Sequence, residues 1–208
     1  LKILFINDIL IIYKIRGGIK LIKLIALDTD GTLLSSKNKI LPSTKRAIKK
    51  ALDLGIKVVL CSGRPIAGLE HFMKELGIEG SDQYAVTLNG AITRTADGKI
   101  MTQDLVNNAL YRALTKFAKE QKVSFNIVDP DSRIITADHD VDYFELLQAW
   151  ENTAPMFIRI PDEMADNFKI SKGCFVGSKK ILDQVEPTLR EKFSKDLYIV
   201  RADDHYSR

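Results

Sequence analysis

Residues 21–34 read LIKLIALDTDGTLL, an apolar run followed by two aspartates and a glycine. Its first part, Leu21–Leu27, is a short and mostly apolar run, which is typical of a buried strand in a parallel sheet. Asp28 follows directly, and Asp30-Gly31 marks a turn. The stretch therefore predicts a buried strand whose carboxyl end carries two carboxylates.

Two more strands are expected downstream, at Lys57–Cys61 and Tyr84–Leu88, each preceded by a helical pattern. Pro42 suits the first turn of the first helix, and Pro65 opens a second helix that ends at Gly77. The order strand, helix, strand, helix, strand predicts right-handed crossovers and a parallel sheet, which places the chain in the α/β class.

The pattern changes after the third strand, where strands and helices no longer alternate regularly. The expected elements are a strand at Lys99–Gln103, a helix at Asp104–Lys122 capped by Asp104, a strand pair at Val123–Val128 and Arg133–Thr136, a helix at Tyr143–Asn152, a strand within Asn167–Val176, a helix at Ser178–Phe193 that Pro187 kinks or shortens, and a strand at Leu197–Arg201. This mixture predicts a separate α+β domain from about Ala91 to about Ala202.

Composition indicates a globular chain, because 45% of its 208 residues are hydrophobic and 28% are charged. The net charge of +4 comes from Lys and Arg interspersed with Asp and Glu, which favours a solvated surface over a nucleic-acid patch. Cys61 and Cys174 are far apart and are interpreted as reduced, buried thiols, so we expect a cytoplasmic protein.

The first segment, Leu1–Gly18, is apolar near its start and basic near its end. It is too short to span a bilayer and lacks the small-residue cleavage site of a secretory signal, so no membrane association is expected. We hypothesise that residues 1–18 are an extension outside the folded domain.

Polar residues follow each of the three predicted parallel strands: Asp28 and Asp30 the first, Ser62 and Arg64 the second, and Asn89 the third. Ligands of open α/β sheets bind outside the carboxyl ends of the strands. The sequence therefore predicts that these side chains meet in one site.

The two carboxylates suggest the chemistry. Residues i and i+2 of an extended strand face the same way, so Asp28 and Asp30 are expected to share one small volume, where a cation such as Mg²⁺ would keep both ionised. One carboxylate can attack phosphorus and form an aspartyl-phosphate, while the other transfers protons. The residues expected to bind the phosphate are Thr29 and Gly31 through backbone N–H groups, Ser62, Gly63, Arg64 and Asn89.

Each residue also has a plainer interpretation. Asp28–Gly31 alone would pass for a polar turn, Ser62 for a helix N-cap, Arg64 for a structural ion pair and Asn89 for a turn former. Cys61 as a nucleophile and His139-Asp140 as a metal-binding pair are weaker ideas, because no further ligand or base lies near either in the sequence.

At these residues a family resemblance is plain. IKLIALDTDGTLL at 22–34 resembles the first motif of the haloacid dehalogenase (HAD) superfamily, and VVLCSGR at 58–64 resembles the second. LNGA at 88–91 resembles the Asn-Gly segment of the Cof-type (HAD-IIB) subfamily, which includes sugar phosphatases. The resemblance implies a HAD-like, Rossmannoid parallel-sheet core with an inserted α+β cap, so that residues 19–90 form the first half of the core and 91–202 the cap.

The resemblance also implies roles. Asp28 would be the nucleophile, Asp30 the general acid and base, and Ser62 a phosphate ligand, with Asp28 and the backbone carbonyl of Asp30 binding Mg²⁺. The implied function is hydrolysis of phosphomonoesters of small metabolites, sugar phosphates among them. A non-catalytic phosphate-binding or regulatory module and a phosphomutase of the same superfamily remain alternatives. The oligomeric state is left open.

The sequence departs from the family pattern after the cap. There the family supplies a Lys and a Gly-Asp…Asn-Asp segment, and neither GDxxxD nor GDxxND occurs in these 208 residues. We therefore expect an incomplete core, with residues 203–208 starting its second half, and little or no turnover by this chain. The first strand is expected to have an unpaired edge, which would favour aggregation or a partner chain.

Overall fold

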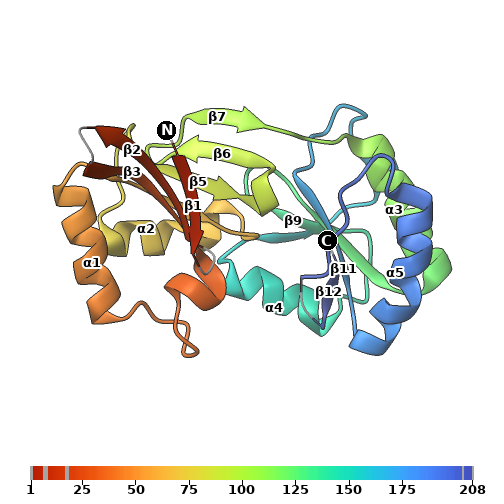
Figure 1. Cartoon of the computed structure of the whole chain (residues 1–208). Coiled ribbons are helices and arrows are strands. Elements are labelled where there is room, and N and C mark those ends of the chain that lie inside the picture. The colour runs from red at the N-terminus through yellow and green to blue at the C-terminus, as the bar shows by residue number, and fades with distance from the viewer. Residues whose placement is uncertain (1, 7–8, 17–18, 203, 208) are drawn as a thin grey trace. The chain divides into compact units, whose positions relative to one another are not determined.

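The structure is a computed structural model that describes residues 2–6, 9–16, 19–202 and 204–207, with side chains from residue 22 onward. The chain divides into two compact units, Leu1–Gln103 and Asp104–Arg208. Each unit is built around its own sheet (Figure 1).

The first unit contains a seven-stranded sheet in which the strands follow one another in sequence order. Its strands are β1 (Lys2–Ile6), β2 (Ile9–Arg16), β3 (Ile19–Asp28), β4 (Lys57–Cys61), β5 (Tyr84–Thr87), β6 (Ile92–Thr95) and β7 (Ile100–Gln103). Only β3, β4 and β5 are mutually parallel, and the other neighbours pair antiparallel. The predicted parallel sheet of three strands is confirmed, with antiparallel strands added at both sides.

Helices α1 (Pro42–Asp53) and α2 (Glu70–Leu76) connect the parallel strands. Ile48 of α1 and Phe72 of α2 pack in one apolar cluster with Val58 and Leu60 of β4, and Leu60 has no exposed surface. Both helices therefore cover the same face of the sheet, as two successive right-handed crossovers in one direction require. This buried layer fixes the strand ends that carry the polar residues.

Two local predictions for this unit are corrected. The helix expected from Pro65 is divided into a 3-10 turn (Ile66–Gly68) and α2, with Leu69 at φ −112° between them. The third strand ends at Thr87, and Leu88–Gly90 forms a 3-10 turn in which Leu88 and Asn89 both have positive φ.

The free edge expected beside β3 is occupied. Strand β2 pairs antiparallel with β3 from Ile9↔Leu27 to Arg16↔Ile19, and β1 pairs with β2. The backbone of the described part of residues 1–18 thus continues the sheet, in contrast to the hypothesis that this segment lies outside the folded domain. The pairing satisfies the N–H and C=O groups that an edge strand leaves open.

The second unit contains a five-stranded sheet in the order β10-β9-β8-β11-β12. Its strands are β8 (Ser124–Val128), β9 (Ile134–Thr136), β10 (Met156–Ile158), β11 (Lys172–Val176) and β12 (Tyr206–Ser207). Its helices are α3 (Asn108–Gln121), α4 (Tyr143–Glu151) and α5 (Lys179–Phe193), and a 3-10 turn spans Pro161–Glu163. The predicted α+β character is confirmed.

Alternation along the strands assigns the helices to opposite faces of this sheet. Phe125 and Ile127 of β8 point into the apolar cluster formed with α3 and α5. Asn126, between them, points the other way and donates hydrogen bonds to Glu145 and Gln148 of α4. The unit therefore has three layers, with α3 and α5 on one face of the sheet and α4 on the other.

Other predictions for this unit are corrected. The expected strand at Leu197–Arg201 is absent: Arg201 makes only an isolated bridge to Ser207, and Tyr206–Ser207 pairs with β11 instead. Helix α3 is capped by Asn107, whose side chain accepts the N–H of Ala109, and not by Asp104. Pro187 lies inside α5 without ending it.

The boundary between the units also differs from the expected one. Strands β6 and β7 continue the sheet of the first unit, so the division falls after Gln103 and not near Ala91. None of the helices in the described part of the chain is long and apolar enough to cross a membrane.

Candidate functional site

The carboxyl ends of the three parallel strands are level with one another. Asp28 at the end of β3 is the register partner of Cys61 at the end of β4, and Cys61 is the partner of Val86 in β5. The segments after these residues therefore leave the sheet side by side, which is the arrangement that the sequence predicts.

The chain leaves the strand immediately after Asp28. Thr29–Leu33 forms a tight turn, closed by the N–H of Leu34, which donates to the carbonyl of Thr29 at 3.0 Å. Gly31 has φ of +80°, a left-handed conformation that glycine adopts without strain. The premise that Asp28 and Asp30 share one face of an extended strand does not hold: Asp28 is half-buried, and Asp30 is exposed on the turn.

The Thr29 side chain is turned into the protein. It has no exposed surface, and its hydroxyl lies 3.3 Å from the carbonyl oxygen of Cys61, to which it donates. This hydrogen bond fastens the turn after β3 to the end of β4. The Thr29 side chain is thus used inside the protein, and the role expected for its backbone N–H stays a prediction.

Arg64 holds the Asp30 carboxylate with two parallel hydrogen bonds. The guanidinium Nε donates to Oδ2 at 3.1 Å and Nη2 donates to Oδ1 at 2.9 Å. The Arg64 side chain is 15% exposed and that of Asp30 is 53% exposed, so the pair lies at the rim of the site. The plainer interpretation of Arg64 as an ion-pair partner is thus the one realised, and two of its donors face Asp30.

Backbone hydrogen bonds join the loop after β4 to the loop after β5. The N–H of Asn89 donates to the carbonyl of Ser62 at 3.2 Å, and the N–H of Leu88 donates to the carbonyl of Arg64 at 3.0 Å. Asn89 has φ of +59°, which agrees with its interpretation as a turn former. Ser62 is nearly buried, and its Oγ accepts the N–H of Arg64 at 3.2 Å, so it does not cap the following helix. Gly63 lies between these two anchored residues.

The structure therefore brings all the predicted site residues to one sheet edge and ties their loops together. Cys61 also lies at this edge, beside Asp28; the sequence suggests it only as a weak candidate nucleophile. Burial, and then the charge of Asp28, raises the pKa of its thiol, which keeps the thiol protonated. Its position beside Asp28 follows from strand register, which cannot be read from the sequence.

The oxygen atoms of Asp28 and Asp30 are of the type that a hard cation binds. The Asp28 carboxylate and the Asp30 carbonyl offer oxygen atoms, and Mg²⁺ commonly keeps several waters beside one or two protein ligands. The Asp30 carboxylate is neutralised by Arg64, so it is not placed as a second anionic ligand. Among the residues that the structure describes, no group of three His, Cys, Asp or Glu gathers as a metal site.

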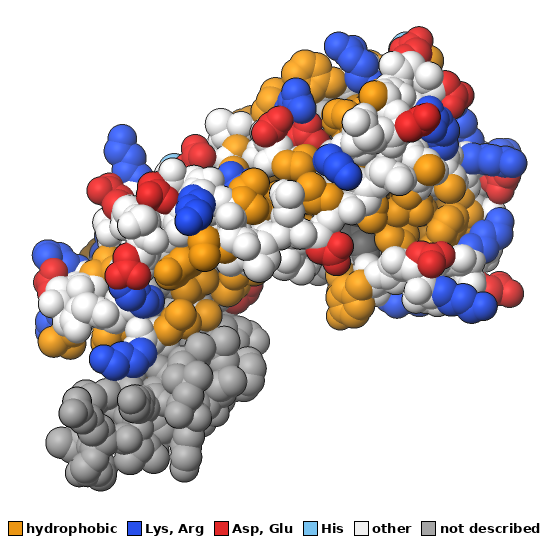
Figure 2. Space-filling model, turned by 90° about the horizontal axis from the view of Figure 1, so that it is seen from above, with side chains coloured by type: hydrophobic (Ala, Val, Ile, Leu, Met, Phe, Trp, Pro, Cys, Tyr) orange, Lys and Arg blue, Asp and Glu red, His pale blue; other side chains and the backbone are white. Residues whose placement is uncertain are grey.

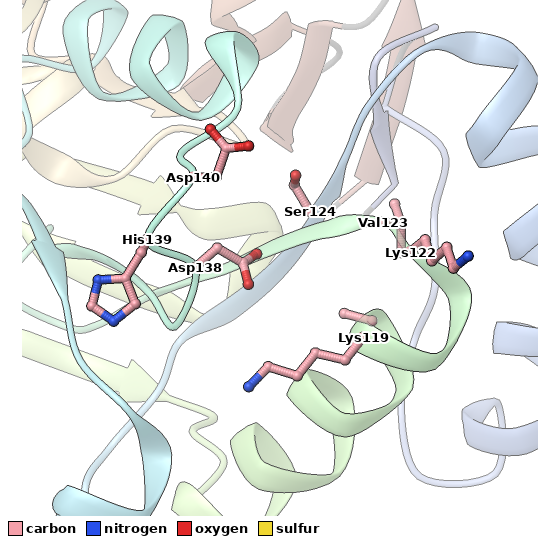
Figure 3. A pocket seen from close by; sticks show the side chains of 8 residues that line it. Lys119, Lys122, Val123, Ser124, Asp138, His139 and Asp140 are labelled. Carbon is pink, nitrogen blue, oxygen red and sulfur yellow. The ribbon is translucent and has the colours of Figure 1, made fainter.

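The second unit has a separate cavity of about 360 Å³. Figure 3 shows the amine of Lys119 and the carboxylate of Asp138 extending toward its middle, whereas Lys122 points away from them. His139 and Asp140, the dipeptide weighed as a metal pair, lie on its rim and are exposed. The cavity belongs to the other unit and adds no residue to the site described above.

The distribution of charge on the surface is relevant to nucleic-acid binding. Figure 2 shows Lys and Arg interspersed with Asp and Glu over the described part of one face of the molecule. Such mixing is typical of a solvated surface, and the expectation that the chain binds no nucleic acid stays a prediction.

Comparisons with known proteins agree with the fold. The sequence profile of the haloacid dehalogenase-like hydrolases matches residues 25–207. YxeH, a candidate phosphatase of Bacillus subtilis, is 27% identical over 177 residues that cover 83% of this chain and 65% of YxeH.

Two solved structures share the fold. A haloacid dehalogenase-like hydrolase of Bacteroides thetaiotaomicron superposes with a TM-score of 0.78 at 24% identity, covering 89% of this chain and 69% of that one. A sugar phosphatase of HAD subclass IIB superposes with a TM-score of 0.65 at 20% identity, covering 89% and 68%. The chain thus spans 65–69% of the length of these three proteins.

Proposed function

The chain belongs to the haloacid dehalogenase-like hydrolase family, and from this premise we propose that it carries the nucleophile-bearing part of a Mg²⁺-dependent phosphatase. The proposed substrates are phosphomonoesters of small cytoplasmic metabolites. Support comes from relatives whose names describe phosphatases, YxeH and the subclass IIB sugar phosphatase among them.

The observation that carries the proposal is the position of Asp28. Asp28 is the last residue of strand β3, level with the end of β4, and the loops holding Ser62 and Asn89 are hydrogen-bonded to each other. A carboxylate carried by a paired strand has its backbone already ordered, which lowers the entropic cost of attack on phosphorus.

We propose the following roles for the chain's own residues. An oxygen of Asp28 attacks the phosphorus, the bond from phosphorus to the leaving oxygen breaks, and the leaving oxygen receives a proton from Asp30. Water then attacks the aspartyl-phosphate and gives its proton to Asp30, which releases phosphate and restores Asp28. Backbone N–H groups of Thr29 and Gly31 and the hydroxyl of Ser62 would orient the phosphoryl oxygens. A bound Mg²⁺, held by Asp28 and the Asp30 carbonyl, would neutralise developing charge on those oxygens.

The Arg64–Asp30 pair favours the form of Asp30 that the second step needs. Both hydrogen bonds point at the carboxylate form of Asp30, which is the form that accepts a proton from water. Donation of a proton to a leaving group requires at least one of these hydrogen bonds to be released. We therefore assign Arg64 to positioning Asp30 in place of the phosphate contact expected from the sequence.

The second unit is proposed to be the cap that selects the substrate. Its α+β architecture agrees with the inserted domain of the Cof-type subfamily. Sugar phosphates are the first class to test, because the subclass IIB neighbour is named as a sugar phosphatase.

The test separates covalent transfer from binding. The chain is incubated with acetyl phosphate with and without Mg²⁺, quenched in acid, and mapped by mass spectrometry for a phosphoryl group on the peptide that contains Asp28. We expect Mg²⁺-dependent modification that is absent in Asp28→Asn and accumulates in Asp30→Asn, where water is no longer deprotonated. Asp53→Asn, an exposed acid paired with Lys49 in the same unit, should behave as the original chain.

The two alternatives predict other results. A binding or regulatory module would leave the Asp28 peptide unmodified at every donor concentration while still binding phosphate. A phosphomutase would pass the trapped phosphoryl group to an added sugar phosphate faster than to water. Either result would contradict the proposed phosphatase.

A further inference from the structure

The cavity of the second unit is lined by three segments that hydrogen bonds hold in place. They are the last turn of α3, the start of β8 and the loop between β9 and α4. The N–H of Val123 donates to the carbonyl of Ala118 at 3.1 Å, which fixes the chain where α3 turns into β8. In the loop, the N–H of Asp138 donates to Oγ1 of Thr136 at 3.2 Å, and that hydroxyl donates to the carbonyl of Phe125 in β8 at 3.0 Å. The walls of the cavity are therefore ordered by the protein itself.

Two side chains of opposite charge reach into this cavity from different elements. Figure 3 shows the amine of Lys119, from α3, and the carboxylate of Asp138, from the loop, both extending toward its middle. Within the described part of the chain, neither of these two side chains has an ion-pair partner within 4.0 Å. Arg112 of the same helix, by contrast, pairs with Asp162 at 3.0 Å. The cavity thus holds a cation and an anion apart.

The Asp138 carboxylate is half-buried, and its charge acts on two buried acids. Burial raises the pKa of the Tyr111 phenol and raises that of the Glu145 carboxyl to about 7, and the negative charge of Asp138 adds to both rises. Neither acid has any exposed surface. A cation placed beside Asp138 in the cavity would therefore be attracted to a carboxylate whose charge is not offset by the protein.

Size and lining restrict the ligand that can fill the cavity. Its volume of about 360 Å³ lies near the lower end of the range for small-molecule sites, which begins at about 300 Å³. Two lysines and two aspartates line it, so their formal charges balance. The apolar members of the lining are Ala118 and Val123, which are nearly buried and offer contact to a small aliphatic group. These features suit a compact ligand with no net charge and a charged group of each sign.

We propose that this cavity binds a small zwitterion, namely an α-amino acid with a short aliphatic side chain. Its carboxylate accepts a hydrogen bond from Nζ of Lys119, and its ammonium group donates to the carboxylate of Asp138. Its side chain lies against Ala118 and Val123. One carbon joins the two charged groups of an α-amino acid, so a single ligand reaches both side chains while they stay apart.

Other occupants fit the cavity less well. A phosphate or another anion would meet the repulsion of Asp138 together with the attraction of Lys119, and like charges in contact cost affinity. A divalent cation needs several oxygen ligands, and no group of three His, Cys, Asp or Glu gathers among the residues that the structure describes. The site is also separate from the proposed phosphatase, since none of its residues belongs to the sheet edge at the end of β3.

The test is a titration of the 208-residue chain with L-alanine, followed by the amide resonances in two-dimensional NMR spectra. We expect saturable shifts on residues 118–124 and 138–140, with a dissociation constant on the order of 1 mM, as suits a ligand of few atoms. Acetate and methylamine each carry one of the two charges and should bind about 10-fold more weakly. Lys119→Met and Asp138→Asn each remove one charged partner and should weaken alanine binding about 10-fold.

Lys116→Met is the matched control, since Lys116 is an exposed lysine of α3, three residues earlier, and does not line the cavity. This variant should bind alanine as the original chain does, and dispersed amide spectra should show that the variants are folded. Lys119 is exposed, so Lys119→Met keeps the test valid even if Asp138→Asn fails to fold.

Three results would overturn the proposal. The first is a folded chain whose amides at 118–124 and 138–140 do not respond to alanine at any concentration. The second is alanine binding that is unchanged in Lys119→Met. The third is acetate or methylamine binding as tightly as alanine, which would mean that the cavity takes a single charge and not a zwitterion.

Discussion

Substitution of the buried Glu145 offers a quantitative test of how burial of a carboxyl group affects the stability of the second unit. Its side chain has no exposed surface, and its carboxylate accepts hydrogen bonds from Asn126 Nδ2 and the N–H of Asp142. Burial raises the pKa of the Glu145 carboxyl to about 7, above its ordinary value of 4.5, and the charge of Asp138 adds to the rise. The hydrogen bonds from Asn126 and Asp142 oppose it without cancelling it.

The direction in which stability changes with pH follows from the protonation state of Glu145 that the folded chain prefers. Because the folded pKa lies above the unfolded one, the folded chain binds the proton more tightly than the unfolded chain. The resulting stability is fully present below about pH 4.5 and is lost as pH rises through 7. A pKa difference of this size corresponds to about 3 kcal/mol, of which about 2.5 kcal/mol falls between pH 8 and pH 5.

Glu145→Gln removes the titrating group and keeps most of the shape. At pH 8 the variant avoids burying a charge but loses one of two acceptors, so we expect it to be about 1–2 kcal/mol more stable than the original chain. At pH 5 the original chain is protonated, and the advantage should shrink by about 2.5 kcal/mol and reverse. Urea denaturation followed by circular dichroism at both pH values measures the two differences.

Glu163→Gln, at an exposed glutamate of the same unit, is the control for general effects of removing an acid and should show no such change with pH. If the stability difference between the original chain and Glu145→Gln is the same at pH 5 and pH 8, then the raised pKa and the burial argument behind it are wrong.

Two further predictions concern the site loops. Gly31→Ala should lower the free energy of unfolding by about 1 kcal/mol, because φ is +80° and the space around the new methyl group is open, so that only backbone strain acts. Gly31→Asn should lower it by less, since Asn tolerates positive φ better than Ala. Equal stability of all three chains in urea would contradict the strain argument. A double-mutant cycle of Arg64→Ala and Asp30→Ala should show a coupling of about 0.5–1 kcal/mol that falls at high salt, since Asp30 is half exposed; strictly additive effects would show that the ion pair does not form in solution.

Much of the first unit could be predicted from local patterns. The strand Lys57–Cys61 has the predicted bounds, and the convergence of Asp28, Ser62 and Asn89 follows from the rule that parallel strands end at one edge. What the sequence could not show is which partners these residues take. Arg64 and Asp30 are 34 residues apart, and their hydrogen bonds depend on how two loops leave the sheet.

The misses have a common physical cause, which is that tertiary pairing overrides local preference. The β-prone run Leu197–Arg201 forms no strand because Tyr206–Ser207 takes the place beside β11. Periodicity predicts α4 as a helix but would turn Leu146 inward, whereas the polar Asn126 at the centre of β8 draws Glu145 to the sheet. The antiparallel strands of residues 2–6 and 9–16 extend the core sheet at an edge that the sequence analysis leaves open.

We propose that Asp28 receives a phosphoryl group in the presence of a divalent cation. Beryllofluoride mimics a phosphoryl group on a carboxylate, and fluorine NMR detects its bound form directly. We expect a bound signal that requires Mg²⁺, disappears in Asp28→Asn and persists in Asp53→Asn. A bound signal that survives in Asp28→Asn, or a folded chain that never gives one with Mg²⁺ and beryllofluoride, would contradict it.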